Sequence, residues 1–153
     1  METELKNNQY LFAISEKIPY YLYKKHRLLT FKGWPYKKKS KCNAEKMASS
    51  GFVYAPNKEC NDVAICIICW KELEGWDSDD NPIDEHRKHS PSCILFNYSL
   101  DLDINSKHTL NTISTLLTHS FNNFMEKFFE NFEKGWEKKR DEILKTLNRY
   151  YKK

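Results

Sequence analysis

Residues 66–93 read CIICWKELEGWDSDDNPIDEHRKHSPSC, and this stretch decides the fold. It opens on two cysteines two residues apart, Cys66 and Cys69, and it contains His86 and ends on Cys93. Three thiolates and one imidazole complete a tetrahedral set for zinc and leave no coordination position for a substrate or a reactive water. The pattern therefore predicts one structural Zn²⁺ ion and argues against a zinc-dependent hydrolase or any other enzyme.

The identity of the imidazole ligand is open on spacing alone. His86 and His89 lie three residues apart on a predicted helix, so both side chains can lean toward the same side. Spacing to Cys93 slightly favours His89, and Cys60 is a further conceivable ligand. Cys42 and Cys60 are otherwise expected to be free thiols. Scattered buried cysteines are the weaker interpretation, because C-x2-C followed by His and Cys is a specific combination.

The charge of the 153-residue chain, +4 in total, is unevenly distributed. Residues 1–58 carry 12 Lys and Arg against 4 acidic residues, residues 59–93 carry 3 against 9, and residues 94–153 carry 10 against 8. The acidic middle segment should repel nucleic-acid phosphates and attract a cationic peptide. The run Lys37-Lys38-Lys39-x-Lys41 is more often a solvated loop than a nucleic-acid site, and we expect no sequence-specific nucleic-acid binding.

Targeting signals are not evident in the sequence. No apolar run approaches the roughly 20 residues that span a bilayer. The acidic start, Met1-Glu2-Thr3-Glu4, does not resemble a signal peptide. We therefore expect no membrane association and an intracellular protein, in which clustered cysteines bind metal rather than form disulfides.

Proline and glycine divide the chain into a turn-rich part and a helix-compatible part. After Pro91 there is no proline, and Gly135 is the only glycine. In the turn-rich part we expect a flexible extension over 1–17 and a strand within Val63–Ile68. Three short helices are expected there: one over Tyr20–Leu29, one that Asn43 caps and Gly51 ends, and one over Ile83–His89 opened by Asn81-Pro82.

The second part repeats apolar residues every three or four positions. A helix over 109–151 would be about 60 Å long, more than a domain of about 90 residues can cover. Part of its apolar face should therefore pack on another chain. The expected partner-binding residues are Leu117, Phe121, Phe124, Phe128, Phe132 and Trp136.

Residues 18–95 resemble a baculoviral IAP repeat, the BIR domain of the inhibitor-of-apoptosis family. The resemblance implies an α+β fold: a small zinc domain of short helices around a three-stranded antiparallel sheet, a linker over 96–108, and one long carboxy-terminal α-helix. It also implies His86, not His89, as the zinc ligand. The matching residues, in order, are Arg27, Phe31, Trp34-Pro35, Ala48, Gly51-Phe52, Pro56, Asp62-Val63, Cys66, Cys69, Gly75-Trp76, Asp80, Pro82, His86 and Cys93.

Within this family, residues 71–76 and 82–90 resemble the single-BIR members that belong to the chromosomal passenger complex. This resemblance implies a BIR that reads the amino terminus of a phosphorylated histone tail. It implies a helix that bundles with two other subunits, which carry a mitotic kinase. The implied locations are centromeres of mitotic chromosomes, the spindle midzone and the cytoplasm. Lys71 and His89 match phosphate-contacting positions, Glu74 and Asp80 match positions around the terminal amine, and Trp76 matches the position beside the first side chain.

Two departures and one alternative accompany the resemblance. Asn43 stands at the family's mitotic phosphorylation site, so that switch is not expected here. Residues 94–108 do not resemble the linker that forms the family's homodimer contact, which leaves homodimerisation open. The alternative function is an inhibitor of apoptosis, whose BIR groove binds amino-terminal death-promoting peptides or restrains caspases.

Overall fold

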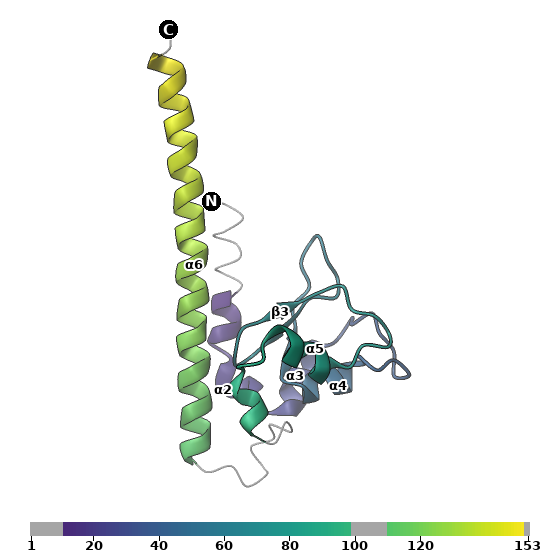
Figure 1. Cartoon of the computed structure of the whole chain (residues 1–153). Coiled ribbons are helices and arrows are strands. Elements are labelled where there is room, and N and C mark those ends of the chain that lie inside the picture. The colour runs from purple at the N-terminus through teal and green to yellow at the C-terminus, as the bar shows by residue number, and fades with distance from the viewer. Residues whose placement is uncertain (1–10, 99–109, 152–153) are drawn as a thin grey trace.

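The computed structural model describes residues 11–98 and 110–151. Short helices surround a three-stranded sheet, and one long helix, α6 (Leu110–Tyr151), runs along one side of this domain and extends beyond it (Figure 1). The expected α+β architecture and the expected long helix are both confirmed. Within the described residues no helix combines the length and apolar character needed to cross a bilayer.

The sheet is small and antiparallel, in the order β1-β2-β3. β1 (Phe52–Tyr54) pairs with β2 (Ala64–Cys66), with Phe52 opposite Cys66, and β2 pairs with β3 (Glu72–Leu73), with Ala64 opposite Leu73. All three residues of β2 are buried, as expected of a central strand in a small core. The strand predicted within Val63–Ile68 is β2.

The helix predicted over Tyr20–Leu29 is divided into α2 (Ile18–Tyr21) and α3 (Lys24–Thr30). The buried guanidinium of Arg27 lies where the two helices meet. Its Nη1 donates to the carbonyls of Tyr21 at 2.7 Å and Leu22 at 3.0 Å, and its Nε donates to Ala48 at 2.8 Å. Arg27 therefore satisfies carbonyls that a continuous helix would have used internally, which stabilises the break.

The amino-terminal segment differs from the flexible extension expected over 1–17. Residues 11–15 are helical, Leu11 and Ile14 are buried, and the Phe12 ring packs edge-on against Phe124 and Phe128 of α6 at centroid distances of 5.3 and 5.1 Å. Apolar residues at spacings of three and four (Leu11, Ile14, Ile18) order this segment. Residues 1–10 lie outside the described residues.

Two further helices begin as their capping residues predict. Asn43 Oδ1 accepts from the Lys46 amide at the start of α4 (Ala44–Ser49), and Asn81 caps α5 (Pro82–His89). Gly51 follows α4 at φ +86°, and a Cβ there would lie 2.4 Å from Leu95 Cδ2, so this turn requires glycine. A 3₁₀ helix, η1 (Ile94–Asn97), crosses the boundary predicted between the zinc domain and the linker over 96–108, and residues 99–108 of that linker lie outside the described range.

Candidate functional site

Cys66, Cys69, His86 and Cys93 converge on one point. Cys66 ends β2, Cys69 follows in the turn before β3, His86 lies in α5, and Cys93 follows α5. Their ligand atoms all lie within 4.8 Å of one another, and Cys69 Sγ is 3.3 Å from His86 Nε2. Zn–S bonds of about 2.3 Å and Zn–N bonds of about 2.0 Å place tetrahedral ligand atoms roughly 3.5–3.8 Å apart. The donor set therefore fits one zinc ion with little movement.

The structure also decides between the candidate ligands. Neither His89 nor Cys60 joins the cluster: His89 Nε2 lies 3.5 Å from Glu85 Oε2, and the Cys60 thiol donates to Asp62 at 2.8 Å. The His86 ring is fully buried, between Phe52 and Phe96 at centroid distances of 4.8 Å each. Aromatic packing therefore aims Nε2 at the thiols, as the family resemblance implied.

The three thiols compete for protons. Burial, followed by hydrogen bonds to Cys69 and Cys93, raises the pKa of Cys66 well above that of an ordinary thiol. Hydrogen bonds from Cys66 and Cys93 hold the pKa of Cys69 far below its usual value. A dication bound here would take all three thiols as thiolates, and their protons would be released on binding.

The turn between the ligands is also the docking surface for α6, which the sequence did not reveal. Three side chains on one face of α6 donate to the backbone carbonyls of this turn. Ser120 Oγ reaches Ile67 O at 2.6 Å, Asn123 Nδ2 reaches Ile68 O at 3.0 Å, and Lys127 Nζ reaches Trp70 O at 2.9 Å. In the sequence this contact is indicated only by polar residues at positions 120, 123 and 127 beside the apolar stripe, and their spacing does not predict which segment they contact.

Trp70 completes this contact from the other side. Its indole Nε1 donates to the Ser120 carbonyl at 2.8 Å, and its ring packs against Phe124 at 5.2 Å. Trp70 has φ +58°, a left-handed conformation that costs a non-glycine residue roughly 1–2 kcal/mol. Trp70 is 2% exposed, and the burial of its side chain under α6 offsets the backbone cost.

Docking on the metal-binding domain buries some of the predicted partner-binding residues of α6 and leaves others exposed. Phe124 is 3% exposed, and Leu117 and Phe128 are half-buried against the same core, so the expectation that Phe124 lies on an open surface is corrected. Its burial follows from contacts with Trp70 and Phe12. Phe121, Phe132 and Trp136 remain 62%, 59% and 67% exposed.

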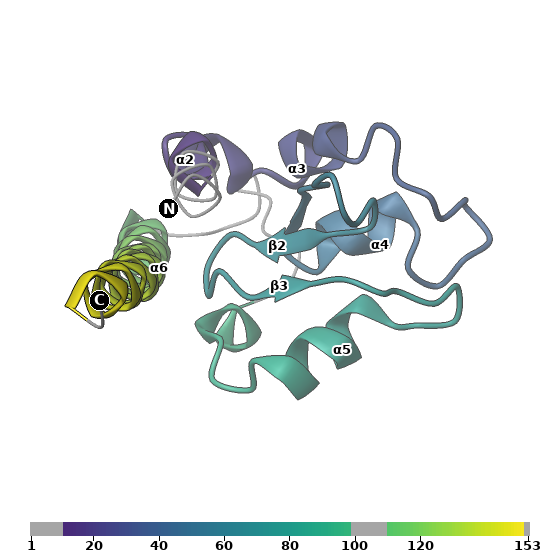
Figure 2. The same ribbon diagram turned by 90° about the horizontal axis from the view of Figure 1, so that it is seen from above.

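The five predicted peptide-binding residues lie in or next to two neighbouring elements, β3 and α5, or in the segment that joins them (Figure 2). Lys71 lies two residues after Cys69, and His89 lies one turn after His86, so both are near the metal end of these elements. Glu74 follows β3 and Asp80 precedes α5, at the other end. Lys71, Glu74 and His89 are exposed, and Asp80 is half-buried. Trp76 is only 5% exposed, packed on Trp34 and Phe52, so it offers a ligand little surface.

Asp62 positions the turn between Glu74 and Trp76. Its carboxylate accepts from the amides of Gly75 at 3.1 Å and Trp76 at 2.8 Å. Burial alone would raise the pKa of Asp62, but donation from the Cys60 thiol and from these amides lowers it below that of an ordinary carboxyl. Asp62 matches the family pattern in the sequence, but its contacts with the Gly75 and Trp76 amides are visible only in the fold.

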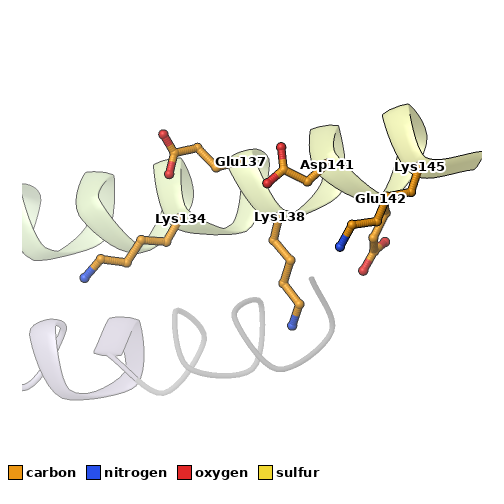
Figure 3. A pocket seen from close by; sticks show the side chains of 6 residues that line it. All are labelled: Lys134, Glu137, Lys138, Asp141, Glu142 and Lys145. Atoms are coloured by element: carbon orange, nitrogen blue, oxygen red, sulfur yellow. The ribbon is translucent and has the colours of Figure 1, made fainter. Parts of the chain in front are cut away.

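A hollow on α6 is lined only by charged side chains: Lys134, Glu137, Lys138, Asp141, Glu142 and Lys145 (Figure 3). Three cations face three acids, so the lining has no net charge to select an ion. The hollow lies far along the helix from the Cys and His cluster (Figure 1). It is not a candidate functional site.

Comparison with known proteins gives one family and a group of close relatives. The model of "BIR: Inhibitor of Apoptosis domain" matches residues 27–97. Baculoviral IAP repeat-containing protein 5, survivin, of Rattus norvegicus is 53% identical over 72 residues, which are 47% of this chain and 51% of the rat protein. Baculoviral IAP repeat-containing protein 5.2 of Xenopus tropicalis is 52% identical over 69 residues, 45% of this chain and 44% of that protein.

The matches thus span about half the length of these relatives. Among solved structures, DIAP1 BIR1 bound to a Grim peptide matches at 24% identity and a TM-score of 0.46, over 63% of this chain and 92% of that one. The match to the BIR model covers residues 27–97, and α6 lies outside it.

Proposed function

We propose that the chain is a survivin-like subunit of the chromosomal passenger complex, because the model of the inhibitor-of-apoptosis BIR domain matches residues 27–97 and survivin of Rattus norvegicus is 53% identical over 72 residues. Its role is binding, not catalysis. The BIR domain, held by one structural zinc ion on Cys66, Cys69, His86 and Cys93, reads the amino terminus of a phosphorylated histone tail. The complex then carries a mitotic kinase to centromeres and later to the spindle midzone, with a further pool in the cytoplasm.

The observation that carries this proposal is the placement of basic and acidic side chains at opposite ends of the neighbouring elements β3 and α5, here called the β3–α5 edge. Lys71 and His89 flank the metal end, and Glu74 and Asp80 flank the other. A helix of the eight residues of α5 is about 12 Å long. An extended peptide covers that distance in three to four residues. A ligand whose terminal ammonium contacts Glu74 and Asp80 would therefore bring a phosphate a few residues later to Lys71 and His89.

Acetylation of the peptide amino terminus should weaken binding at least about tenfold. The acetyl group removes the positive charge that Glu74 and Asp80 would hold, and a hydrogen bond to a charged group contributes about 1.5–3 kcal/mol. Calorimetry with free and acetylated forms of one histone-tail peptide measures the difference. A matched Glu59→Gln variant, an acid outside the edge, should keep the full discrimination, whereas Glu74→Gln should reduce it. Equal affinity for both peptides contradicts an amine site.

Phosphate on the peptide should strengthen binding, and this gain separates the two functions proposed for a BIR domain. A reader of phosphorylated tails needs Lys71 and His89, whose side chains can donate hydrogen bonds to phosphate. An inhibitor that captures unphosphorylated death-promoting peptides needs only the acidic end. Lys71→Ala and His89→Ala should each abolish the gain, while Lys88→Ala, which removes a cation paired with Glu85 on the same helix, should retain it. If phosphate has no effect on wild-type affinity, the apoptosis-inhibitor function becomes the better explanation.

The distal half of α6 supports the proposed assembly with two other subunits. Beyond Phe128 the large apolar side chains that the structure describes as exposed are Phe129, Phe132, Trp136, Ile143, Leu144 and Leu147. A soluble monomer rarely exposes so much apolar surface in one stretch. Pairing this face with helices of other subunits would bury it.

Phe132→Glu with Trp136→Glu should remove the helix partners and leave the BIR domain intact. Co-purification of tagged full-length chain from mitotic cells measures partner loss, and zinc content with peptide affinity measures the BIR domain. A control, Lys134→Glu with Lys145→Glu, also adds two carboxylates to exposed positions of the same helix and should keep the partners. Retention of every partner by the first variant excludes this surface.

A further inference from the structure

Four lysines form a short, well-held loop on the surface of the BIR domain. Lys37, Lys38, Lys39 and Lys41, here called the lysine loop, are all exposed. Hydrogen bonds fix their backbone: the Ser40 amide donates to Lys37 O at 2.9 Å, and Asn43 Nδ2 donates to Lys38 O at 3.1 Å. Because Asn43 also caps α4, the loop is attached to a helix terminus. The backbone that carries these lysines is therefore held in place.

The loop is also fastened to the acidic turn that begins the proposed amine site. The Lys41 amide donates to Ser78 O at 2.7 Å, the Cys42 thiol donates to Asp77 O at 3.0 Å, and the Tyr36 hydroxyl donates to Trp76 O. These bonds hold the lysine loop beside residues 76–80. Both segments lie at the end of the domain remote from α6 (Figure 2). Partners on α6 would leave this end open.

Most of the loop charge is not neutralised within the chain. The ion pair between Lys41 and Asp79 is 3.9 Å long, with side chains 60% and 89% exposed, and such a pair contributes little. Among the described residues, no carboxylate lies within salt-bridge distance of Lys37, Lys38 or Lys39. The Asp80 carboxylate instead accepts from the Asp77 amide at 2.7 Å within its own turn. At least three adjacent cations are thus available to a polyanion.

We propose that the lysine loop binds the phosphate backbone of duplex DNA, without reading its sequence, beside the peptide site. Lysine is a compact point charge that suits phosphate, and several neighbouring cations suit the closely spaced phosphates of a duplex. Between Tyr36 and Cys42 the loop carries no large apolar side chain that could insert into a lipid surface. The choice of DNA rests on the proposed function, since a histone tail in the peptide site brings nucleosomal DNA within reach.

The test compares two variants of equal charge in the full-length, zinc-loaded chain. One changes Lys37, Lys38 and Lys39 to Gln, and the control changes Lys25, Lys58 and Lys145 to Gln, three lysines outside the loop. Fluorescence anisotropy with a 20-base-pair duplex is measured between 50 and 200 mM salt. Each lost phosphate contact lowers the slope of log K against log salt by about 0.9. The loop variant should therefore have a salt slope smaller in magnitude by about 2–3, and its affinity at 50 mM salt should fall at least about tenfold. The affinity of the control variant should fall by less than about twofold.

Several results overturn the proposal. One is no binding of DNA by the wild type at 50 mM salt. Another is an equal loss in both variants, which would assign binding to net charge. A third is unchanged DNA binding in the loop variant with lost binding to vesicles containing 30% phosphatidylserine, which would assign the loop to membranes. Peptide affinity is measured in parallel on the same variants. If the protein does not bind DNA but still binds the acetylated peptide more weakly than the free one, only the DNA proposal is overturned. Intact DNA binding without acetylation sensitivity overturns only the tail reader.

Discussion

Replacing Cys66 with serine should unfold the BIR domain. Cys66 is fully buried and shares its site with Cys69, His86 and Cys93. A serine hydroxyl is a poor zinc ligand. Structural zinc contributes about 10–16 kcal/mol in small zinc domains, and a domain of this size has a total stability of only about 5–15 kcal/mol. Loss of most of the metal affinity should therefore remove the cooperative folding transition altogether.

Metal analysis and circular dichroism of the purified variant measure this result. The wild type should hold one zinc per chain and lose its folded signal with a chelator. Cys60→Ser is the matched control, because the Cys60 thiol donates to Asp62 outside the cluster and a hydroxyl can also donate. The control should keep both zinc and fold. A Cys66→Ser protein that unfolds cooperatively without metal would show that the four residues are not a structural zinc site.

Phe124→Ala should destabilise the chain by about 3–5 kcal/mol, the usual cost of truncating a buried phenylalanine. Phe124 is 3% exposed and touches both Trp70 and Phe12. Its removal therefore leaves a cavity between α6, residues 11–15 and residues 67–70, the segment at the zinc ligands that is here called the metal turn. Trp70 should become partly solvated, because the ring that covers it is gone.

Phe121→Ala provides a control of the same chemistry on the same helix. Phe121 is 62% exposed, and truncation of such a residue usually changes stability by less than about 0.5 kcal/mol. Urea unfolding of both variants, followed by tryptophan fluorescence at saturating zinc, measures the difference. Equal stabilities would mean that α6 does not dock on the BIR domain in solution, and that the whole apolar face is open to partners.

The sequence predicted those features that depend on local pattern or on specific chemistry. The zinc ligands follow from spacing and residue type, and the resemblance chose His86 where spacing alone slightly favoured His89. The caps Asn43 and Asn81 mark helix starts because side-chain hydrogen bonds act over two or three residues. The long helix follows from its apolar period and the lack of proline.

The features that escaped prediction depend on contacts between distant segments. A period of three and four residues shows that one side of α6 is apolar, but not that Phe124 packs on Trp70, more than fifty residues away. Residues 11–15 were expected to be flexible because the surrounding stretch is polar, yet Phe12 packs against the α6 rings. The resemblance placed Trp76 beside the first side chain of a bound peptide, but packing on Trp34 and Phe52 leaves it only 5% exposed.

The docking of α6 at one side of the domain sets a length scale for anything the helix carries. Its last hydrogen bond to the metal turn comes from Lys127, and residues 129–151 continue beyond the domain (Figure 1). At 1.5 Å per residue this overhang is about 35 Å long. A helix fixed at one end by packing acts as a stiff spacer, and an attached domain then samples a limited shell around the anchor point. Distance from the anchor, more than affinity, would decide which substrates a tethered enzyme can reach.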